Sequence, residues 1–168
     1  MLELILNHPL LYDGPAMVKA PIVFAAGALR ALGRPIDTAA WAWLCNQAGQ
    51  YLFWPPNVSG WDESRWLDTG TWRGRWNIAG YAVQPQVIDP WGPTTNYDTT
   101  ETATTAVERA LRFCGNPSIT AETRQGLVDF ATKALPVPIA SWELGPLRAV
   151  RQNALRMLVL TCSDLQTS

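Results

Sequence analysis

Helical periodicity without strand-like alternation is the feature that most limits the fold of this 168-residue chain. Apolar residues recur every three to four positions in successive segments, which is the spacing of one helix face. Apolar and polar residues nowhere alternate strictly over more than four positions, as a half-buried strand requires. The sequence therefore predicts an all-α fold, an irregular bundle of six or seven helices. Predicted helices span residues 21–32, 37–50, 69–82, 102–114, 120–135 and 146–161, and residues 2–6 have the spacing of the end of another.

Prolines, glycines and capping residues set the limits of these segments. Pro21 suits a first helical turn because its missing N–H leaves no hydrogen bond unmade there. Gly33 suits a left-handed helix stop, and Thr120 suits a helix cap. Gly27, inside the first of these helices, would allow a close approach by a neighbouring helix. Residues 83–101 lack a helical pattern and are predicted to form a long arm ordered on the surface.

Composition and charge exclude several classes of protein. The net charge is −1, with 13 basic and 14 acidic residues and no basic run, so the sequence indicates no nucleic-acid partner. No apolar stretch approaches the roughly 18 residues of a membrane-spanning helix, and the N-terminus lacks the cationic region of a signal peptide. We expect a single helical domain over residues 1–168. Because the chain opens on a helix with no entry loop, we also expect it to be the C-terminal fragment of a longer protein.

Cysteine and histidine content gives no sign of a catalytic or metal centre. Cys45, Cys114 and Cys162 are odd in number and widely spaced, which argues against a disulfide framework or a zinc site. Buried free thiols are expected, with one disulfide and a leftover thiol as the alternative. His8, the single histidine, has no partners for a metal site or a nucleophilic triad. The sequence predicts no cofactor, no metal site and no catalytic residue.

The segment YLFWPPNVSGWD, residues 51–62, interrupts the helical pattern. Its tandem prolines forbid a helix and favour a short, rigid polyproline-like strut. Asn57 can hydrogen-bond its own turn. Our first interpretation is an internal plug, meaning a loop whose side chains Phe53, Val58 and Trp61 fill the space between helices.

Tryptophans make a binding role the alternative interpretation of this loop. Trp41, Trp72 and Trp76 lie at helical spacings and are expected in the core. Trp54 and Trp61 flank the loop, and binding residues are common on loops. Indole faces stack on sugars, so a carbohydrate-binding domain using these two tryptophans is an alternative function. The candidate binding residues are Trp54, Asn57, Trp61, Asp62 and Arg65.

Carboxylates near the loop leave a third function open. Asp62, Glu63 and Asp68 follow it closely. Paired carboxylates in a cleft can act as acid and base in glycoside hydrolysis. The third alternative is therefore part of a hydrolase that a missing N-terminal region would complete. Solvated carboxylates at a helix start have the same spacing, so no catalytic residue is assigned.

Several motifs resemble one bacterial family, the domain of unknown function 1800. The pair His8-Pro9, the start of the helix at Lys19-x-Pro21, and the segment GQYLFWPPNVSGW at 49–61 match its typical motifs. The match is strong over residues 1–80 and weak in the tail, where the chain has CSDLQ in place of a SPEYQ-like segment. Residues 22–24 also lack the acidic residue that usually precedes the aromatic one.

This resemblance implies a largely helical protein that is usually longer than this chain and often exported, to the periplasm or cell surface. It assigns no activity. The family's genes frequently neighbour those of a sulfatase-like family, so the resemblance implies a sulfatase-like protein as the first partner to consider. We therefore predict an uncharacterised helical scaffold or protein-interaction module of a bacterial, exported protein, non-enzymatic in this chain.

Overall fold

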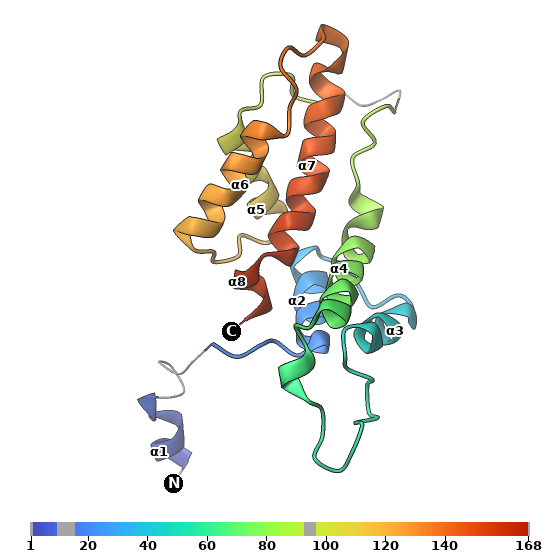
Figure 1. Cartoon of the computed structure of the whole chain (residues 1–168), viewed down its shortest axis with the longest axis vertical. Helices are drawn as coiled ribbons and strands as arrows, with labels where there is room; N and C mark the ends of the chain where they lie inside the picture. The colour runs from blue at the N-terminus through green and yellow to red at the C-terminus, as the bar shows by residue number, and fades with distance from the viewer. Residues whose placement is uncertain (1, 10–15, 93–96, 168) are drawn as a thin grey trace.

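The structure is a computed structural model that describes residues 2–9, 16–92 and 97–167 (Figure 1). All regular elements in these ranges are helical, which confirms the predicted all-α fold. The described residues contain eight α-helices where six or seven were predicted, because the short α8 has no periodic signal of its own. The α-helices are α1 (Leu2–Leu6), α2 (Pro21–Ala31), α3 (Ala40–Gln47), α4 (Thr69–Val83), α5 (Ala103–Phe113), α6 (Ala121–Lys133), α7 (Leu144–Thr161) and α8 (Ser163–Gln166). Short 3-10 helices occupy Glu63–Arg65, Gln84–Gln86 and Ser141–Glu143.

Two groups of helices share one hydrophobic core. Helices α2, α3 and α4 pack together, as do α5, α6 and α7, and α4 packs against α7 to join the groups (Figure 1). Ile78 of α4 and Leu155 of α7 are both fully buried in the same apolar cluster. None of the helices in the described ranges is both long and apolar enough to cross a membrane.

Tryptophans and cysteines of the core follow the sequence expectations with one exception. Trp41 is buried and Trp72 is half-buried, but Trp76 is exposed, so the prediction that placed Trp76 in the core is wrong. The face of α4 that packs inward carries smaller or polar residues instead, including Gly74. Cys45 and Cys114 are buried free thiols, as predicted, whereas Cys162 is a free thiol that is only half-buried.

Alkaline pH should destabilise the protein through the Cys45 thiol. Burial raises the pKa of Cys45 from 9.0 to about 11. Between these values the unfolded chain releases the thiol proton while the folded chain keeps it, so the folded state binds more protons and stability falls as pH rises. When the pH rises from about 8 to about 11, the free energy of unfolding should fall in both proteins. The fall should be about 2 kcal/mol smaller in the Cys45→Ala variant than in the unaltered chain. Urea denaturation over this range measures the difference, and parallel stability curves would contradict the expectation.

The predicted arm lies along α7. The Asn153 side chain accepts a hydrogen bond from the Ile88 N–H (3.0 Å) and donates one to the Ile88 carbonyl (2.7 Å). Arg156 donates through Nη1 to the Gln86 carbonyl at 2.7 Å. These bonds attach the first part of the arm to the surface, as the sequence predicts. Residues 93–96 of the arm lie outside the described residues.

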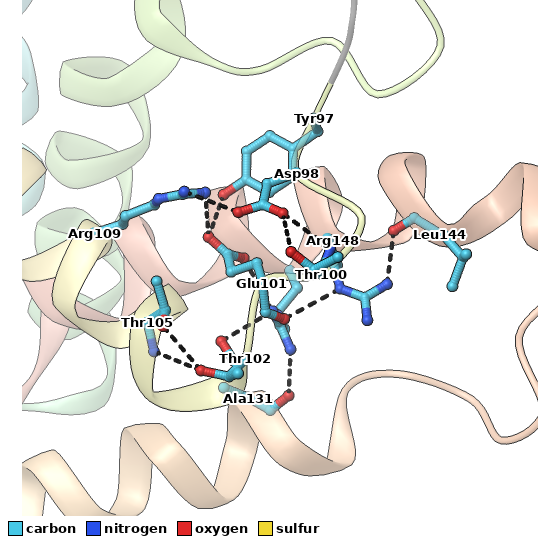
Figure 2. Close-up of polar contacts among 11 residues, drawn as sticks. Tyr97, Asp98, Thr100, Glu101, Thr102, Thr105, Arg109, Ala131, Leu144 and Arg148 are labelled. Carbon is cyan, nitrogen blue, oxygen red and sulfur yellow. Dashed lines mark hydrogen bonds and ion pairs between the residues drawn. The ribbon is translucent and has the colours of Figure 1, made fainter.

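The end of the arm is anchored by a buried carboxylate, Glu101 (Figure 2). One carboxylate oxygen accepts hydrogen bonds from the Tyr97 hydroxyl and from Arg109 Nη1, both at 2.8 Å. The other accepts from Arg151 Nη2 at 2.9 Å. The Glu101 carbonyl accepts from Arg148 Nε at 3.2 Å and from Arg151. This network ties the arm to α5 and α7.

A buried arginine, Arg75, joins three distant parts of the chain. It donates to the Trp66 carbonyl at 3.0 Å, to the Gln166 side-chain oxygen at 3.1 Å and to the Lys19 carbonyl at 2.5 Å. The Lys19 N–H in turn donates to the Gln166 carbonyl at 2.8 Å. Burial lowers the pKa of Arg75 to about 10. Arg75 thus fixes the segment that follows the loop of residues 51–62 against both ends of the helical core.

Candidate binding site

The loop of residues 51–62 lies on the surface, so the prediction of an internal plug is wrong. Phe53 is 94% exposed and Val58 is fully exposed. Helices α3 and α4 contact each other directly at Gly74, and a Cβ atom there would lie 2.4 Å from the Ala48 nitrogen. No gap remains between these two helices for loop side chains to fill. Phe53 also adopts a left-handed backbone conformation (φ 61°), which is uncommon for a non-glycine residue.

Hydrogen bonds nevertheless hold the start of the loop and order a turn within it. The buried Gln50 side chain, just before the loop, accepts a bond from the Ile22 N–H at 3.0 Å. The Asn57 side chain accepts a bond from the Ser59 N–H at 2.8 Å, which confirms its predicted role in its own turn. Gly60 closes that turn by donating to the Asn57 carbonyl at 3.1 Å, and its φ of 97° favours glycine. The loop is a surface feature whose flanking residues Gln50 and Trp66 are bonded to the helical core.

Four exposed aromatic side chains form what we call the aromatic patch: Trp43, Tyr51, Phe53 and Trp54. Each is at least half exposed. Trp43 comes from α3, and the other three come from the start of the loop. An apolar depression of about 390 Å³ is lined by Ala39, Ala42, Trp43, Tyr51, Leu52 and Phe53. A second one, of about 320 Å³, lies between Tyr51 and Trp54, so the Tyr51 ring borders both.

The five residues expected to bind are only partly brought together. Trp54 belongs to the aromatic patch, whereas Trp61 is half-buried, and among the described residues no ring contact joins the two. Asn57 is exposed on its own turn. Asp62 accepts a bond from the Ser64 N–H at 3.2 Å and begins the 3-10 helix that contains the exposed Arg65.

Sequence reasoning missed three members of the patch. Trp43 lies off the apolar stripe of its predicted helix, and this position was the available sign of exposure. Tyr51 and Phe53 carried no such sign, since an aromatic residue in a loop is compatible with burial or exposure.

The carboxylates near the loop have the environment of helix caps. Asp68 accepts a hydrogen bond from the Thr71 N–H at 2.9 Å, and this bond is the main reason that the pKa of Asp68 is lowered. A general acid in glycoside hydrolysis needs a raised pKa. The described part of the chain contains no group of three His, Cys, Asp or Glu side chains that could hold a metal ion.

A family model described as "Protein of unknown function (DUF1800)" matches residues 1–166. The chain belongs to the DUF1800 family. The match includes residues 83–145, where the sequence motifs carried no resemblance. No curated protein and no solved structure matches the chain. In this DUF1800 protein, the aromatic patch therefore overlaps the family-like segment GQYLFWPPNVSGW, which begins at Gly49.

Proposed function

We propose that this DUF1800 protein is a helical protein-interaction module and that the aromatic patch is its docking surface. The observation that carries this proposal is the exposure of four large aromatic side chains around two adjoining depressions of the surface. Exposed clusters of large apolar side chains are typical of interaction sites, and Trp and Tyr are enriched among the residues that dominate binding energy. The hydrogen bonds of Gln50 and Arg75 support the proposal because they hold the loop in place before a partner arrives.

The shape of the patch favours a protein partner over a carbohydrate. Two adjacent apolar depressions divided by Tyr51 suit two apolar side chains of a partner. Sugar binding also needs several hydrogen-bonding groups that can contact hydroxyls. Apart from Tyr51 and the indoles of Trp43 and Trp54, the side chains that line the two depressions carry no hydrogen-bonding group.

A carbohydrate remains the second candidate because Trp54 is 74% exposed. The half-buried Trp61 weakens it, since the second indole of the expected platform is then less available. The hydrolase alternative has less support, since the Asp62 and Asp68 side chains accept backbone hydrogen bonds at helix starts.

The first partner to test is a sulfatase-like protein, because the family resemblance implies one.

Binding between the two purified proteins tests the proposal by isothermal titration calorimetry. The double variant Phe53→Ser/Trp54→Ser should bind about 100-fold more weakly, because two central aromatic contacts are each expected to contribute more than about 1 kcal/mol. Both side chains are exposed in the free chain, so the variant should fold normally.

A matched control removes two exposed tryptophans elsewhere. Trp91 and Trp142 are 61% and 68% exposed, and their ring centroids lie 6.2 Å apart. Residues 141–143 lie at the opposite end of the molecule from the loop of residues 51–62 (Figure 1). The variant Trp91→Ser/Trp142→Ser should bind as the unaltered chain does. An equal loss of affinity in both variants would contradict the proposal that the aromatic patch is the docking surface. Glycan binding that depends on Trp54 would favour the carbohydrate function.

A further inference from the structure

A second depression, remote from the aromatic patch, lies between α5, α7 and the arm. It has a volume of about 420 Å³ and is lined by Tyr97, Arg109, Arg112, Phe113, Gln152 and Arg156. We call it the arginine pocket. We propose that the arginine pocket binds an oxyanion group, meaning a carboxylate, sulfate or phosphate, carried on a small organic molecule.

Helical spacing places these side chains on one surface. Arg109, Arg112 and Phe113 occupy positions i, i+3 and i+4 of α5, which face the same way. Gln152 and Arg156 occupy positions i and i+4 of α7, which packs against α5. The arm completes the wall near Tyr97, whose hydroxyl bonds to Glu101 (Figure 2).

The charges around the pocket leave two arginines uncompensated. Arg109 is paired with Asp98 at 3.1 Å and with Glu101 at 2.8 Å. The second oxygen of Glu101 is occupied by Arg151, outside the pocket. Among the described residues, no carboxylate lies within ion-pair distance of Arg112 or Arg156. A partly enclosed site with unbalanced positive charge concentrates anions, although the net charge of the whole chain is −1.

Arg156 is held in a fixed position for binding. Its guanidinium lies over the Phe113 ring, 3.9 Å from the centroid, and its Nη1 donates to the Gln86 carbonyl at 2.7 Å. Its Nε is buried without a hydrogen-bond partner, and its Nη2 makes no hydrogen bond with the described residues. Burial lowers the pKa of Arg156, so its surroundings stabilise the charge poorly without an anion. A bound oxyanion would supply the missing negative charge.

The size of the pocket indicates more than an inorganic ion. A volume of about 420 Å³ lies in the range of sites for small organic ligands. The rings of Tyr97 and Phe113 provide apolar surface for the rest of such a molecule. This site lies on other helices than the aromatic patch and does not depend on the function proposed for it.

Titration of the chain with four probes at low salt tests the proposal. The probes are inorganic phosphate, phenyl phosphate, phenyl sulfate and benzoate, and binding is followed by calorimetry and by the NMR signals of the arginine side chains. At least one aryl probe should bind more tightly than about 1 mM and more tightly than inorganic phosphate, and added salt should weaken it. The aryl probe that binds most tightly identifies the oxyanion. If every probe binds more weakly than about 1 mM, the proposal is wrong.

Two variants and one control localise the binding. Arg112→Gln should weaken it about tenfold, and because Arg112 is exposed this variant should fold normally. Arg156→Gln should weaken it by at least as much. Arg73→Gln removes an exposed arginine of α4 and should leave binding unchanged. If Arg73→Gln weakens probe binding as much as Arg112→Gln does, binding reflects general charge attraction. That result would contradict a specific site in the arginine pocket.

Discussion

Replacing Gly74 with alanine is expected to lower the free energy of unfolding by about 3 kcal/mol. The new Cβ would lie 2.4 Å from the Ala48 nitrogen and 2.4 Å from the Gln47 carbonyl carbon. Both are backbone atoms at the end of α3, so no side-chain rotation can relieve the contact. Helices α3 and α4 would have to move apart, and their packing would be lost. Urea denaturation followed by circular dichroism measures the change.

Gly126 provides a control of opposite sign. It lies within α6, and a Cβ atom there would have no neighbour within 4 Å. Gly126→Ala should therefore raise stability by about 0.5–1 kcal/mol, since alanine restricts the unfolded chain and favours the helix. A similar small effect in both variants would show that α3 and α4 do not touch at Gly74.

Helix positions were predictable because their signals are local. Thr120 caps α6 by accepting a bond from the Thr123 N–H at 3.2 Å, and Pro21 occupies the first turn of α2. The start of α3 was predicted three residues early, at Asp37. The Asp37 side chain accepts a bond from Trp41 Nε1 at 3.1 Å instead of capping the helix backbone. Thr38, the other candidate cap, accepts a bond from the Ala40 N–H at 3.2 Å.

Close helix contacts were not predictable in the same way. Gly27 would allow a close approach as well, but a Cβ atom there would meet nothing within 4 Å. The close approach occurs at Gly74 instead. A glycine permits contact with a neighbour, but the neighbour is chosen by the packing of the whole core, which periodicity does not contain.

The candidate sites show the same difference between features set by local sequence and features set by long-range packing. The turn at Asn57 was predicted, because an Asn side chain can bond its own backbone. The exposure of the loop's aromatic side chains and the left-handed conformation of Phe53 were not predicted, because no residue preference indicates them. The arginine pocket was missed because it joins α5 to α7, whose lining residues Arg112 and Arg156 are far apart in the sequence.

Replacing Glu101 with leucine is expected to lower the free energy of unfolding by about 3–5 kcal/mol. The Glu101 carboxylate is fully buried and is bonded to Arg151, whose side chain is 2% exposed. Without the carboxylate, Arg151 keeps a buried charge with no counter-ion, which is more costly than the loss of an exposed pair. The control is Asp98→Ala, because Asp98 also pairs with Arg109 but is 36% exposed. That variant should lose less than about 1 kcal/mol.

A double-mutant cycle separates the charge effect from simple loss of contacts. Glu101→Leu/Arg151→Met removes both buried charges and keeps apolar volume, so it should be more stable than Glu101→Leu alone. Arg151 also donates to the carbonyls of Ala131 and Glu101, and these bonds disappear in Arg151→Met, so recovery will be incomplete. Thermal and urea denaturation of the four proteins give the coupling free energy. If the two single losses simply add in the double variant, the ion pair is not what makes Glu101 important, and its bond to Tyr97 becomes the main anchor of the arm.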